Sequence, residues 1–156
     1  MLGSLRRSVV AVTIASALIV GLAGCSGSSS TAANSTSTTV ATNACKFEYQ
    51  AAASKLNGIA RYFSQAAQDG QMNAQFAQFA ANYVDAMKTF DAAVLALDCP
   101  AAVKAELAGL VTAQEALEPL VAQFTGASRP PVAEFNAAAQ AVAEAVRRVN
   151  TALGIS

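Results

Sequence analysis

The side chains of this chain that could take part in chemistry are three cysteines and scattered carboxylates, because the sequence contains no histidine. Histidine is the usual general base and the commonest protein metal ligand. Without it the serine triad, the imidazole-activated thiol and the Glu-x-x-His pairs of di-iron bundles have no counterpart here. The sequence therefore predicts no catalytic residue, no metal site and no cofactor, and indicates that the protein is not an enzyme.

The carboxylates offer one arrangement that could bind a hard cation. Glu115 and Glu118 lie one helical turn apart and could combine with Glu134 or Glu144. The alternative is that these are solvated carboxylates on helix faces, and the sequence favours it. Glu144 also lies four residues before Arg148, a spacing that predicts an ion pair on one helix.

The first cysteine, Cys25, follows a segment with the three parts of a secretory signal. Arg6 and Arg7 come first, an apolar run extends from about residue 9 to residue 22, and Leu-Ala-Gly-Cys closes the segment at 22–25. This ending resembles the lipobox of bacterial lipoproteins. The resemblance implies transfer of a diacylglycerol carrying chains such as palmitate to the Cys25 sulfur, and cleavage between Gly24 and Cys25. A plain signal peptide with an incidental cysteine is the alternative.

The resemblance also implies a location. The mature protein would be exported and attached to the outer face of the cell membrane through acyl chains on Cys25, because two or three chains give durable attachment. Removal of residues 1–24 leaves eight basic and ten acidic side chains, a net charge of −2. A nucleic-acid partner would require a basic surface, so none is expected.

The remaining cysteines, Cys45 and Cys99, form an even pair in an exported chain. An oxidising compartment favours a disulfide between such residues. We therefore predict a Cys45–Cys99 disulfide that joins the start of one helix to the end of the next.

Residues 25–43 differ in composition from the rest of the chain. Eleven of the eighteen residues at 26–43 are serine or threonine, and none is charged. Such a segment buries too little apolar surface to offset its ordering entropy. We expect a lipidated N-terminus followed by a disordered, flexible tether. An O-glycosylated stalk is the sharper alternative.

Residues 44–156 show apolar side chains at helical spacing, with no period-two alternation. Four amphipathic helices are predicted, at about 45–69, 71–98, 100–125 and 130–153, separated by Gly- and Pro-containing turns. Short turns make neighbouring helices antiparallel. The predicted fold class is thus all-α, an up-down-up-down antiparallel four-helix bundle with one disulfide.

Two residues disturb the third apolar stripe. Gln114 lies on it, and Pro119 removes one backbone hydrogen bond inside the predicted helix. The simpler explanations are that Gln114 is a core amide hydrogen-bonded to a neighbour and that Pro119 only curves the helix. The alternative is that Gln114 and Pro119 mark a widened gap between helices that admits a ligand.

Two functions remain from these observations. The first is a lipid-anchored, non-enzymatic envelope protein whose bundle binds another envelope component, most simply a protein. The second is a carrier or sensor of a small apolar ligand, a lipid or haem, held between the helices. A haem would require axial ligands from Tyr or Met side chains, since histidine is absent.

Overall fold

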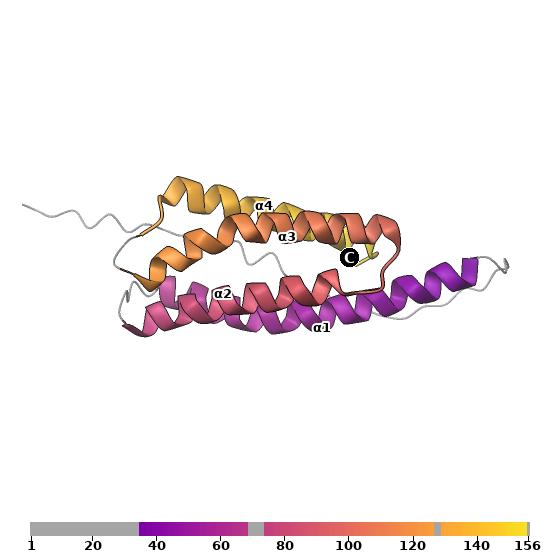
Figure 1. The fold of residues 1–156 in the computed structure, drawn as a ribbon, viewed down its shortest axis with the longest axis horizontal. Coiled ribbons are helices and arrows are strands. Elements are labelled where there is room, and N and C mark those ends of the chain that lie inside the picture. Colours follow the sequence, from indigo (N-terminus) through magenta and orange to yellow (C-terminus); the bar gives the residue numbers. More distant parts are fainter. Residues whose placement is uncertain (1–34, 69–73, 127–128, 156) are drawn as a thin grey trace, which may run out of the picture.

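A computed structural model describes residues 35–68, 74–126 and 129–155 of the chain. They form four α-helices, α1 (Ser35–Gln68), α2 (Ala74–Leu95), α3 (Ala101–Ala122) and α4 (Val132–Ala152) (Figure 1). A short 3₁₀ turn, η1 (Gln123–Thr125), follows α3. The described residues contain no β-strand. The prediction of an all-α helical bundle is confirmed.

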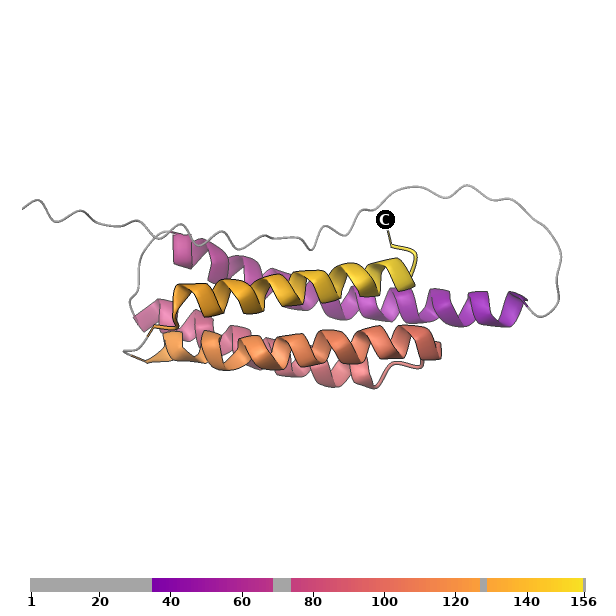
Figure 2. The same ribbon diagram turned by 90° about the horizontal axis from the view of Figure 1, so that it is seen from above.

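The helices form two layers. Helices α3 and α4 lie together in one layer, and α1 and α2 lie in the other (Figure 1). The layers approach most closely along α2 and α3, whereas no described Cα of α1 comes within 8 Å of one in α4. Seen from above, α4 crosses over α1 at an angle (Figure 2). The α2–α3 contact is therefore the main backbone seam between the layers.

The predicted disulfide is confirmed at one end of the bundle. Cys45 in α1 bonds to Cys99 in the α2–α3 connection, with their Cα atoms 5.2 Å apart. At the same end the Nζ atom of Lys46 donates a hydrogen bond of 2.9 Å to the carbonyl oxygen of Gly154. Gly154 adopts a left-handed conformation, φ = 61°, just beyond the end of α4, which glycine permits without steric cost.

Aromatic side chains close the opposite end. Phe63 in α1 packs its ring against those of Phe76 in α2, Tyr83 in α2 and Phe124 in η1, with centroids 5.3, 5.3 and 5.7 Å away. Phe124 in turn meets Phe135 of α4 edge to face at 5.7 Å. One cluster thus ties together elements of both layers.

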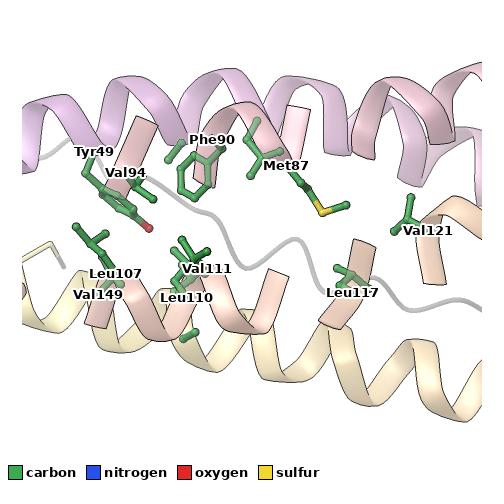
Figure 3. Close-up of a cluster of buried hydrophobic side chains, with 14 of the residues drawn as sticks. Tyr49, Met87, Phe90, Val94, Leu107, Leu110, Val111, Leu117, Val121 and Val149 are labelled. Atoms are coloured by element: carbon green, nitrogen blue, oxygen red, sulfur yellow. The ribbon is translucent and has the colours of Figure 1, made fainter. Parts of the chain in front are cut away.

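The core between these ends consists of the predicted apolar stripes. Met87, Leu107, Leu110 and Val149 are almost completely buried between the layers (Figure 3). Gln114 lies among them with 3% of its surface exposed, as its place on the stripe predicts. Val132, the first residue of α4, lies outside this core and is 46% exposed.

Helix α1 begins ten residues earlier than predicted, so residues 35–43 of the expected disordered tether are helical. No glycine or proline occurs between Ser35 and Asn57. Once the part of α1 after Cys45 is packed, each added turn requires only helix propagation, which is far less costly than nucleation. This extension projects past the bundle (Figure 1). Residues 1–34, with the expected signal and lipidation site, lie outside the described residues.

The other helix ends also differ from the prediction by a few residues. Helix α2 ends at Leu95 rather than near residue 98, because the disulfide and Pro100 constrain the connection. Asp98, which precedes Cys99 and Pro100, does not cap α3; its carboxylate meets the Lys104 ammonium at 3.3 Å. Helix α3 continues through Pro119 to Ala122, and its last turns slope toward α2 (Figure 1).

Candidate partner-binding groove

A groove of about 570 Å³ runs along the outer face of the bundle between α1 and α2. We call it the α1–α2 groove and define it by its lining residues. Its floor consists of the less exposed residues Ala52, Leu56, Ile59, Phe79, Ala86 and Phe90. Its rim consists of the exposed residues Lys55, Tyr62, Asn82, Asp85, Thr89 and Ala93. The surface of the groove is therefore mainly apolar, with a polar margin.

Small side chains create the hollow. Ala52 on α1 and Ala86 and Ala93 on α2 lie where larger residues would fill the space between the two helices. No residue of α3 or α4 lines the groove, so the second layer leaves this face uncovered. The groove therefore exists because the α1–α2 layer has apolar side chains on two faces, and α3 and α4 cover only one of them.

The rim carries one charge on each helix. Lys55 of α1 and Asp85 of α2 are both exposed. Within the described parts of the chain, ion pairs join only Lys104 with Asp98, Arg147 with Glu144 and Arg148 with Glu106. The rim ammonium and the rim carboxylate are thus both free to meet charges from outside.

A second polar feature lies on the α2–α3 seam. Asp91 of α2 is 7% exposed, and its Oδ1 atom has no hydrogen-bond partner; the same holds for the Oε1 atom of Gln114. Burial raises the pKa of Asp91 to about 7, and the nearby carboxyls of Glu118 and Glu115, with a hydrogen bond to Glu118, add to the rise. We call Asp91, Gln114, Glu115 and Glu118 the polar seam.

The polar seam does not form the cation site considered from the sequence. Among the residues that the structure describes, no three His, Cys, Asp or Glu side chains converge as a metal ion requires. Glu144, one of the expected contributors, meets the Arg147 guanidinium at 3.8 Å. The expected Glu144–Arg148 pair is wrong, because Arg148 reaches across to Glu106 of α3 at 3.1 Å instead.

The residues predicted to mark a ligand gap lie away from the groove. Gln114 is buried on the seam and Pro119 is exposed on α3, and neither lines the groove. Of the Tyr and Met residues considered as haem ligands, Tyr62 lines the groove, while Tyr49 and Met87 are buried in the core. Met72 lies outside the described residues.

The predicted anchor residues Gly24 and Cys25 also lie outside the described part of the chain. Within that part, no helix has the length and apolar character needed to cross a membrane. Comparison with protein-family models, curated proteins and solved structures gives no match to this chain. The groove and the polar seam are the features on which a function can be argued.

The sequence stripes did not predict the groove. Ala52, Ile59 and Phe79 occupy apolar positions at helical spacing, which predicts a place in the core, yet all three are partly exposed on the floor of the groove. The sequence does contain an indication of the groove. Ala52, Ala86 and Ala93 have small side chains, which leave space between α1 and α2 on one side.

Proposed function

We propose that this chain is a lipid-anchored, non-enzymatic protein of the bacterial envelope that binds another envelope protein through the α1–α2 groove. The single observation that carries the binding site is the exposed, mainly apolar groove between α1 and α2. The lipobox-like ending at Cys25 supports the anchor and the exported location. The lack of histidine and of a nucleophile–base pair supports a role in binding rather than catalysis.

We infer that the helices run up-down-up-down and antiparallel. The Cys45–Cys99 bond and the Lys46–Gly154 hydrogen bond support this order, because they bring the early part of α1, the end of α2 and the end of α4 together. Helix α1 begins beyond this end of the bundle (Figure 1). A membrane anchor at Cys25 would then direct the disulfide end toward the bilayer and leave the groove along the exposed flank.

The shape of the groove favours a protein over an enclosed small molecule. Its α1 side runs from Ala52 to Tyr62, about 15 Å at the rise of an α-helix. Two helices line it and its outer side is open, whereas typical small-ligand sites bury most of the ligand surface. Amphipathic helices bind such grooves with their apolar face.

A pair of tryptophan substitutions tests this role. Ala86→Trp fills the groove floor, whereas Ala105→Trp places the same side chain on the exposed surface of α3. The full chain is extracted from its membranes in mild detergent, and co-purifying proteins are identified by mass spectrometry. We expect a partner that is retained by the natural chain and Ala105→Trp and lost from Ala86→Trp. Size-exclusion chromatography of the same extracts shows whether this partner is a different protein or a second copy of the chain. Identical protein profiles together with an identical size of the complex for both variants would contradict the proposal.

The groove volume supports a second candidate, a carrier of an apolar lipid or of haem. A volume of about 570 Å³ lies in the range of small-molecule sites. Tyr62 is the one tyrosine that lines it and would be the haem ligand. Small-molecule mass spectrometry on the same extract distinguishes the candidates: a stoichiometric lipid or haem absent from Ala86→Trp would favour the carrier.

A further inference from the structure

The two free charges on the rim of the groove stand at the same height along α1 and α2. Tyr49 packs against Phe90, with ring centroids 6.2 Å apart, and Phe63 packs against Phe76 at 5.3 Å. Lys55 lies six residues after Tyr49 and eight before Phe63, and Asp85 lies five residues before Phe90 and nine after Phe76. The groove therefore presents a cation on one helix and an anion level with it on the other.

Two such grooves can pair with opposite charges facing each other for only one of two orientations of a twofold axis. If two copies meet face to face about a twofold axis parallel to the helices, α1 of one copy covers α2 of the other. Lys55 then faces Asp85 of the partner subunit, and the pair is repeated by symmetry, as isologous contacts require. An axis across the helices would instead place α1 on α1 and bring like charges together. The charges thus select the orientation of the pair.

The apolar part of the groove fits the same arrangement. Tyr62 is 63% exposed and lines the rim on α1, opposite Phe79 and Asn82 on α2. Helix α1 of each copy would lie over α2 of the other, so each Tyr62 ring would enter the partner's groove. Apolar burial then provides the affinity, while the exposed ion pairs provide mainly orientation.

We propose that the occupant of the α1–α2 groove is a second copy of this chain, held face to face by reciprocal Lys55–Asp85 ion pairs. The proposal rests on the proposed function and names the partner at that same site. An axis parallel to the helices keeps the disulfide ends of both copies on the same side. Both N-terminal tethers can then reach one membrane, as a lipid anchor on each copy demands.

The test is site-specific photo-crosslinking of the full chain in its own membranes. A photoreactive amino acid replaces Asn82 on the rim of the groove, and a matched control carries it at Ala105 on α3. We expect a product of twice the chain mass from position 82 and none from position 105. Lys55→Glu and Asp85→Lys should each lower the yield of that product at least about fivefold, because each puts like charges opposite each other. The double variant should restore it to within about twofold.

Each other outcome overturns the dimer. A crosslink from position 82 to a different protein would show a foreign occupant and leave the proposed function standing. A crosslink to a lipid would favour the carrier. If the single charge reversals leave the dimer product unchanged, or the double variant does not restore it, the two copies do not meet through Lys55–Asp85 pairs. No product at position 82, together with no groove-dependent co-purifying protein, would contradict both the dimer and the proposed function.

Discussion

The carboxyl groups of Asp91 of α2 and Glu118 of α3 lie close enough across the seam between the two layers to act on each other electrostatically. A carboxyl group with a like charge beside it favours its protonated, neutral form. Asp91 is buried, and the groups that act on it electrostatically, Glu118 and Glu115, are both acidic. Burial and these carboxylates together raise the pKa of Asp91 to about 7, so the proton resides in the seam under mildly acidic conditions.

The first prediction is a stability that declines as pH rises. Because the pKa of Asp91 is raised from 3.8 to about 7 on folding, the folded state binds one proton more than the unfolded state between these values. The free energy of unfolding should therefore decrease with a slope approaching 1.4 kcal/mol per pH unit from about pH 4 to pH 7. The stabilisation from this extra proton is fully present below about pH 4 and is lost above about pH 7. Urea unfolding followed by circular dichroism at several pH values measures it.

Two substitutions separate this effect from general charge changes. Asp91→Asn removes the titrating group and keeps the shape, so it should flatten the pH dependence. Glu48→Gln changes an exposed carboxylate on α1, away from the groove, and should leave the dependence as it is. An unchanged slope in Asp91→Asn would show that another group controls it.

The disulfide should account for a large share of the stability. Cys45 and Cys99 are 54 residues apart, and closing such a loop stabilises the folded state by about 4 kcal/mol in the chain-entropy model. Denaturation with and without reductant should reveal a loss of about that size, and a Cys45→Ala/Cys99→Ala variant should reproduce it. Thiol titration of the protein from its native source gives an independent check. Two free thiols in the non-reduced, denatured chain would contradict the bond.

Two phenylalanines on α1 provide a matched test of the aromatic cluster. Phe63 is 1% exposed and contacts three other rings, whereas Phe47 is 69% exposed. Phe63→Ala should destabilise the chain by about 3–5 kcal/mol through lost burial and a residual cavity. Phe47→Ala should change stability by less than about 0.5 kcal/mol. Equal losses in the two variants would mean that the cluster does not hold the far end of the bundle.

The sequence sufficed to predict the four helices, most of their buried residues and the disulfide. The spacing of Phe76, Met87 and Val94 identifies the core face of α2 without any knowledge of its neighbours. The extension of α1 back to Ser35 was missed because composition suggested disorder, while helix propagation from the packed part of α1 determined the result.

The buried Asp91 and the α1–α2 groove depend on which faces of the helices contact each other. The apolar periodicity of a single helix does not show which neighbour covers which face. Asp91 follows Phe90 and would pass as a solvated residue, yet α3 covers it in the folded chain. The groove arises in the same way, because α3 and α4 pack on one side of the α1–α2 layer and leave the other side open. Both follow from tertiary packing.

Intact-mass and N-terminal peptide analysis of the protein purified from its native membranes tests the central claim, a bundle anchored through Cys25, most directly. We predict a mature chain whose first residue is Cys25, with a diacylglycerol thioether on its sulfur. A Cys25→Ser variant should lack this mass and leave the membrane fraction. A mature chain that begins elsewhere, or that carries an unmodified Cys25, would contradict the anchor.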